Sequence, residues 1–113
     1  MQRTRLLRAA SLMALILSAP AVPSLAGEAA VSPTIVMAKD FMFAPTSLTI
    51  KSGSTVTWTN KDDEPHTVVS DAGLFRSSAM DTNESFSFKF DKPGTYRYVC
   101  SIHPRMVGTI VVQ

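Results

Sequence analysis

The sequence predicts an all-β domain, an antiparallel sandwich of two sheets with seven or eight short strands. Two observations carry this prediction. Apolar and polar residues alternate over short segments of residues 34–113, and turn residues recur there every eight to twelve positions. No segment has the length and the 3.6-residue apolar period of a substantial helix. Short strands of this kind bury their apolar faces by packing one sheet on another, which is the arrangement of a sandwich.

The first 26 residues have the composition of a cleaved secretory signal peptide. Arg3, Arg5 and Arg8 precede a stretch of apolar or small residues, and the tripeptide SLA that follows suits a cleavage site. The apolar core, about 11 residues long, is shorter than the roughly 20 residues that a helix needs to cross a bilayer. We therefore expect a signal peptide at 1–26, a flexible lead at 27–33 and one domain at 34–113, without stable membrane association.

The first strands follow from the alternation. TIVMAKD at 34–40 and SLTIK at 47–51 are the first two, and Pro45 in the intervening FMFAP is expected to break any pairing. KSG then makes a turn. STVTWTN at 54–60 places a valine and Trp58 on one face and its threonines on the other, which predicts a core position for Trp58.

The second half of the domain continues the same pattern. PHTVVSD at 65–71 is a short strand, and 74–80 is expected to be a loop with one helical turn. ESFSFKF at 84–90 turns its three phenylalanines inward. TYRYVC at 95–100 puts its two tyrosines and its cysteine on one face, and GTIVVQ at 108–113 forms the last strand.

Charge and cysteine content exclude some functions. Loss of the three signal-peptide arginines lowers the basic residues from 11 to 8, against 9 acidic residues, so the mature net charge is about −1. The mature part has no Lys/Arg cluster with interleaved aromatic residues, which argues against a nucleic-acid partner. Export leads to an oxidising compartment, but a single cysteine, Cys100, cannot form an internal disulfide. It is a buried thiol, an intermolecular link or a functional thiolate, and composition does not choose among these.

Four residues with metal-binding side chains occur in two short segments. Cys100, His103 and Met106 stand at i, i+3 and i+6 between two predicted strands, and the other histidine, His66, begins an earlier strand. One thiolate, two imidazoles and one thioether make a donor set that suits copper cycling between Cu(I) and Cu(II). The set therefore predicts one copper ion, with fast one-electron transfer as the consequence.

The segments FMFAPTSLTIKSGSTVTWTN, EPHTV and PGTYRYVCSIHPRMVGTIVV resemble the small blue copper proteins, or cupredoxins, of the amicyanin, pseudoazurin and plastocyanin type. The resemblance covers nearly the whole mature chain, and the Cys-x2-His-x2-Met loop is most similar to that of amicyanin. It implies that Cys100 is the thiolate ligand, His66 and His103 the equatorial imidazoles and Met106 the axial ligand. It also implies a Greek-key sandwich of about eight strands with the copper near one end.

One position departs from the family pattern. Several family members have asparagine directly after the first ligand histidine, where its side chain ties the two ligand loops together, but this chain has Thr67. A threonine hydroxyl could make a shorter link, to Ser101. Such bonds around the ligands tune their geometry and the properties of the metal.

These observations predict a type 1 (blue) copper protein that acts as a soluble, monomeric one-electron carrier in the periplasm and is not an enzyme. His66 is expected to be the buried imidazole and His103 the exposed one, at which a redox donor and acceptor dock transiently. Pro104 and Pro65 would supply an apolar rim, and Arg105 a charge that biases the choice of partner.

The same residues allow other interpretations. The main alternative is a periplasmic protein for copper trafficking or buffering. A zinc site leaves the methionine unexplained, and a Cys-His thiol enzyme lacks an orienting residue and a pocket in a chain this short. The KDDE segment at 61–64 is expected to be a solvated loop, and Met37, Met42 and Met80 are expected to be core or surface residues.

Overall fold

The structure is a computed structural model that describes residues 10–21 and 34–113. Residues 10–21 have neither helix nor strand and belong to a unit separate from the domain. The rest of the predicted signal peptide and the predicted lead at 27–33 lie outside the described residues, so both stay predictions. In the described part of the chain, no helix is long and apolar enough to cross a membrane.

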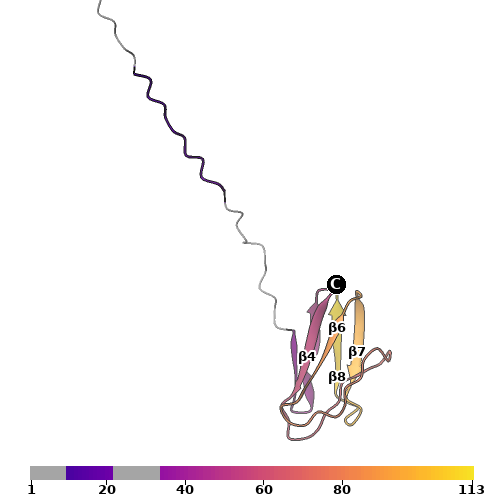
Figure 1. The fold of residues 1–113 in the computed structure, drawn as a ribbon. Coiled ribbons are helices and arrows are strands. Elements are labelled where there is room, and N and C mark those ends of the chain that lie inside the picture. The colour runs from indigo at the N-terminus through magenta and orange to yellow at the C-terminus, as the bar shows by residue number, and fades with distance from the viewer. Residues whose placement is uncertain (1–9, 22–33) are drawn as a thin grey trace, which may run out of the picture. The chain divides into compact units, whose positions relative to one another are not determined.

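Within residues 34–113, eight strands form two four-stranded sheets. This arrangement confirms the predicted sandwich (Figure 1). The first sheet has the order β2-β1-β4-β6 and the second the order β3-β8-β7-β5. The strands are β1 (Ile35–Lys39), β2 (Met42–Ala44), β3 (Ser47–Ile50), β4 (Ser54–Asn60), β5 (Val69–Ser70), β6 (Ser85–Phe90), β7 (Gly94–Val99) and β8 (Val107–Val112).

Both sheets are mixed, because each contains one parallel pair. β1 runs parallel to β4, with Val36 opposite Trp58, and β3 runs parallel to β8, with Leu48 opposite Ile110. The other strand pairs are antiparallel. The chain crosses from one sheet to the other after β2 and crosses back after β3, so the parallel partners are not joined by a hairpin.

The segment around Pro45 is more regular than predicted. Met42–Ala44 forms β2, the hairpin partner of β1, with Lys39 opposite Met42. Pro45 directly follows the last paired residue, so its missing N–H removes no bond from the ladder. The expectation that this segment would not pair is therefore wrong.

The segment 65–80 is less regular than predicted. The strand expected at 65–71 is reduced to the two residues of β5. The following loop has no helical turn and instead runs back along this segment through isolated bridges, His66 to Met80 and Val69 to Arg76. The helical turn expected at 74–80 is therefore wrong, because backbone pairing with residues 66–69 holds the loop extended.

Aromatic residues fill the space between the sheets. Trp58 is fully buried, as predicted, and its ring packs against Phe75, Phe86, Phe90 and Tyr98. The Tyr98 ring covers Gly108 on β8, where an added Cβ would lie 2.2 Å from the ring, so this position needs glycine. The core thus extends along β7 to Tyr98 and, beyond the strand, to Cys100, which is also fully buried.

Three segments that are far apart in the sequence meet at one end of the sandwich. They are the turn after β1, the loop after β4 and the loop after β7. The loop after β7 lies at the opposite end of the domain from the C-terminus (Figure 1). The predicted ligands all lie on the loops of this end.

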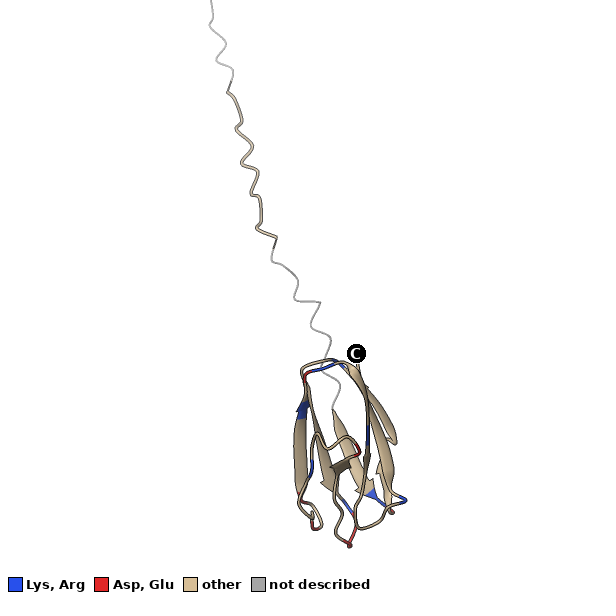
Figure 2. Cartoon of the chain, turned by 90° about the vertical axis from the view of Figure 1, so that its right-hand side faces the viewer, with Lys and Arg blue, Asp and Glu red and all other residues tan. Residues whose placement is uncertain are grey.

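The charged residues are mixed in sign. Figure 2 shows Lys and Arg interspersed with Asp and Glu on the face of the domain that it presents.

Candidate metal centre

The loop between β7 and β8, here called the ligand loop (residues 100–106), carries three of the predicted ligands. The antiparallel ladder ends where Val99 faces Val107. Cys100 N–H then donates to the Met106 carbonyl at 3.0 Å, and Met106 N–H donates to the His103 carbonyl at 2.9 Å. Cys100 and Met106 are 0% and 2% exposed. The hairpin therefore closes with both sulfur-bearing residues in the core at its base.

His66 approaches the same end from the loop after β4. Its N–H and carbonyl pair with Met80 at 3.1 and 2.8 Å. The loop is held by the fully buried Asn60, whose Nδ2 donates to the carbonyls of Glu64 and Met80 at 2.8 and 2.9 Å. The Asn60 Oδ1 accepts the Asp62 N–H at 2.9 Å. One buried amide thus uses both donors and its acceptor to fix the backbone that carries His66.

Three predicted ligands come together as a triangle of donor atoms. His66 Nδ1 lies 3.2 Å from His103 Nδ1, and each of these nitrogens lies 3.8 Å from Cys100 Sγ. In a trigonal plane, a metal with bonds of about 2.0 Å to nitrogen and about 2.3 Å to sulfur would separate its donors by about 3.5 Å (N to N) and about 3.7 Å (N to S). The triangle fits a single ion, and in the described part of the chain these side chains form the group able to hold one.

The surroundings of Cys100 favour its thiolate. Burial acts to raise the pKa of the thiol, but this is outweighed by hydrogen bonds from the Thr67 N–H, from the His103 backbone and from both histidine rings, which lower the pKa to about 6. The Thr67 N–H lies 3.4 Å from Sγ. Since the thiolate is the form that binds metals, little free energy is needed to prepare this ligand at neutral pH.

The two histidines differ in exposure as predicted. His66 is fully buried, whereas His103 is half-buried. The ring of Phe41, from the turn after β1, packs edge-on against both imidazoles, with centroid distances of 5.5 Å to His66 and 4.9 Å to His103. Phe41 is itself 48% exposed. The outer side of the site is therefore formed by one imidazole edge and one aromatic ring.

Thr67 makes the predicted link to Ser101. The two side-chain oxygens lie 2.7 Å apart, and the Ser101 N–H donates to Thr67 Oγ1 at 2.8 Å. The Thr67 side chain also lies 3.8 Å from Cys100 Sγ. The hydroxyl thus joins the residue after His66 to the residue after Cys100, the connection for which several family members use asparagine.

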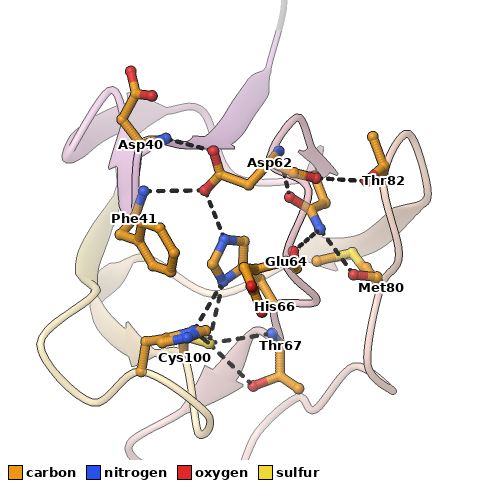
Figure 3. Close-up of polar contacts among 11 residues, drawn as sticks. Asp40, Phe41, Asp62, Glu64, His66, Thr67, Met80, Thr82 and Cys100 are labelled. Carbon is orange, nitrogen blue, oxygen red and sulfur yellow. Dashed lines mark hydrogen bonds and ion pairs between the residues drawn. The ribbon is translucent and has the colours of Figure 1, made fainter.

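Two further residues belong to the site, and the sequence pattern does not indicate either of them. No role is expected for Phe41, and Asp62 falls in the segment expected to be a solvated loop. The structure instead places Asp62 Oδ2 2.7 Å from His66 Nε2 (Figure 3). Burial acts to raise the pKa of Asp62, but hydrogen bonds from the Phe41 N–H, the His66 ring and the Asp40 N–H lower it below its usual value. The available signal was weak, an acidic residue four positions before a histidine.

Met37, Met42 and Met80 occupy core or surface positions, as expected. Met80 is buried, and Met37 and Met42 are exposed on the outer side of the first sheet.

Comparison with known proteins gives one family for the whole domain. Residues 30–113 match the family model described as copper binding proteins, plastocyanin/azurin family. The chain is 37% identical to amicyanin-alpha from Methylorubrum extorquens over 91 residues, 76% of each protein. It is 42% identical to a plastocyanin from Scenedesmus fuscus over 85 residues, which is 64% of this chain and 87% of the plastocyanin.

The fold of this domain is also similar to that of a solved amicyanin structure. A reduced mutant of amicyanin superposes with a TM-score of 0.69 at 32% identity, covering 76% of this chain and 87% of the amicyanin. The similarity therefore extends over both the sequence and the arrangement of the strands.

Proposed function

The chain belongs to the plastocyanin/azurin family of copper-binding proteins, and from this premise we propose that it is a soluble one-electron carrier whose single copper ion is held by His66, Cys100, His103 and Met106. The observation that carries the proposal is the triangle of two imidazole nitrogens and one thiolate sulfur, with edges of 3.2 and 3.8 Å. Its relatives among the amicyanins and plastocyanins are electron carriers rather than enzymes, which supports a role without catalysis.

Copper supplies one-electron chemistry to such a donor set, because thiolate and thioether favour Cu(I) while imidazole accepts both oxidation states. The residues of the chain supply a rigid frame. Cys100 is held at the base of a closed hairpin, and His66 is held by its bridge to Met80. A frame fixed in this way limits rearrangement when the charge of the site changes, which favours rapid electron transfer.

The surface around His103 supports brief contacts with redox partners. His103 is half-buried, Pro104 and Arg105 beside it are exposed, and Pro65 is half-buried. Apolar groups at an exposed ligand edge suit the small, rapidly exchanging interfaces of redox encounters. We place these encounters, between a monomeric carrier and its donor or acceptor, in the periplasm, because the sequence begins with the pattern of a signal peptide.

Trafficking or buffering of copper is the alternative. It requires ready release of the ion, and the full burial of His66 and Cys100 argues against that. A competition with a Cu(I) chelator separates the two functions, since a carrier of electrons should give up its copper slowly and a carrier of copper rapidly.

The test of the copper site is a titration of the purified metal-free protein with Cu(II), followed by visible spectroscopy. We expect an intense thiolate-to-copper charge-transfer band at one equivalent, which ascorbate bleaches. Cys100→Ser should abolish the band because it removes the thiolate. A pale spectrum without this band would contradict the proposed site.

A further inference from the structure

The side chain of Asp62 receives three N–H groups from two different parts of the domain. Its Oδ1 accepts the Asp40 N–H at 2.6 Å, and its Oδ2 lies 3.0 Å from the Phe41 nitrogen and 2.7 Å from His66 Nε2 (Figure 3). The side chain is 11% exposed, and that of His66 is fully buried. A carboxylate in this position is well satisfied and largely withdrawn from water.

The first part of the domain that donates to the Asp62 carboxylate is the turn between β1 and β2. Asp40 and Phe41 both have left-handed backbone conformations, with φ of 53° and 57°. Residues other than glycine seldom adopt this conformation, least of all a bulky one such as Phe41. Two consecutive N–H groups of the turn converge on the Asp62 carboxylate, which stabilises a conformation that neither residue favours by itself.

The backbone of Asp62 is also held in place. Its N–H donates to Asn60 Oδ1 at 2.9 Å, and its carbonyl accepts the hydroxyl of Thr82 at 2.6 Å. The carboxylate is therefore fixed from its own main chain as well as from the groups that it accepts. It can act as a rigid partner for His66 rather than as a mobile surface charge.

The second part of the domain that donates to the Asp62 carboxylate is the ring of His66. Its Nδ1 belongs to the donor triangle, at 3.8 Å from Cys100 Sγ, so this nitrogen must keep a free lone pair to bind copper. The proton of the neutral ring then resides on Nε2, where the Asp62 carboxylate accepts it. A carboxylate on the far nitrogen of a ligand histidine fixes its tautomer and orientation and makes the ligating nitrogen more basic.

We propose that Asp62 is a positioning residue of the copper site, which orients His66 and lowers the reduction potential by favouring Cu(II). This inference rests on the proposed function, and it adds a residue outside the predicted ligand set. The direction follows from electrostatics, because a negative charge behind the buried ligand stabilises the more positive oxidation state of the ion. The same carboxylate fixes the turn that holds Phe41 against both imidazoles.

The test compares two aspartates that are neighbours in the sequence. Asp62→Asn removes the charge behind His66, and Asp63→Asn removes the same charge from an exposed residue as a matched control. The copper-loaded proteins are compared by spectroelectrochemical titration of the blue band. We expect the potential of D62N to lie above that of the unsubstituted protein, D63N to stay close to it, and Asp62→Glu, which keeps the charge, to fall between D62N and the unsubstituted protein.

NMR of the ¹⁵N-labelled Cu(I) protein gives a second readout that does not depend on the folding of any variant. We expect a slowly exchanging, downfield-shifted proton on His66 Nε2. A rapidly exchanging proton there would overturn the inference, and so would a D62N potential no higher than that of D63N. Absence of the blue band from the unsubstituted protein would instead overturn the proposed function, and this inference with it.

Discussion

The candidate site has two halves that are built in different ways. The ligand loop supplies Cys100, His103 and Met106 from seven consecutive residues, closed by two backbone hydrogen bonds. The other half, which we call the His66 side, combines His66 with Asp62 from the same loop and Phe41 from a different hairpin. The first half is encoded by spacing within a hairpin, and the second depends on the pairing of distant strands.

The two halves also differ in their access to solvent. His103 is half-buried on the ligand loop, whereas His66 is fully buried and the Phe41 ring packs against it. The more accessible half is the one at which we propose that a redox partner docks, and the buried half is expected to hold its ligand without exchange with water. The same kind of substitution is therefore expected to have different effects in the two halves.

The largest expected effect is the loss of the blue band on removal of either imidazole. Imidazole added to the solution should then distinguish the two variants. Exogenous imidazole should restore the band of copper-loaded His103→Gly, because the gap opens at the surface. It should fail to restore that of His66→Gly, because the cavity is enclosed. Visible titration with imidazole measures both, and rescue of both variants to the same extent would contradict the difference in access.

A smaller effect, on stability, is expected from Asn60→Ala. The substitution leaves the Asp62 N–H and the Glu64 carbonyl without their partner, in part-buried positions. It also removes one of the two donors to the Met80 carbonyl, in a buried position, where the His66 N–H remains. We expect a loss of about 3 kcal/mol in the free energy of unfolding, since unsatisfied buried polar groups cost roughly 1–3 kcal/mol each and part of the loop can relax. Urea denaturation of the metal-free protein measures it.

The matched control for Asn60→Ala is Thr57→Ala on the same strand. The Thr57 hydroxyl pairs with Ser87 at 2.8 Å on the exposed face of the sheet. Water can replace this bond, so the control should lose less than about 1 kcal/mol. Equal losses for the two variants would show that the buried amide does not organise the His66 side.

The difference between the ligand loop and the His66 side also explains what could be predicted from the sequence. Alternation is local, so it located most strands and the core position of Trp58, and the ligand loop could be found because its three residues lie within one hairpin. The Thr67–Ser101 link was predicted because the family resemblance placed the two ligand segments side by side. Asp62 and Phe41 could not be found in this way. They are 21 residues apart, and their contact depends on the parallel pairing of β1 with β4, for which the alternation contains no signal.

The smallest expected effect measures the connection between the halves directly. Thr67 follows His66, Ser101 follows Cys100, and their hydroxyls lie 2.7 Å apart. A double-mutant cycle with Thr67→Val and Ser101→Ala isolates this contact, and we expect a coupling of about 1 kcal/mol in the unfolding free energy of the metal-free protein. Because Thr67 Oγ1 also accepts the Ser101 N–H, Thr67→Val should cost more than Ser101→Ala. Strictly additive single effects would mean that the two halves are held together by the shared core and the metal rather than by this hydroxyl pair.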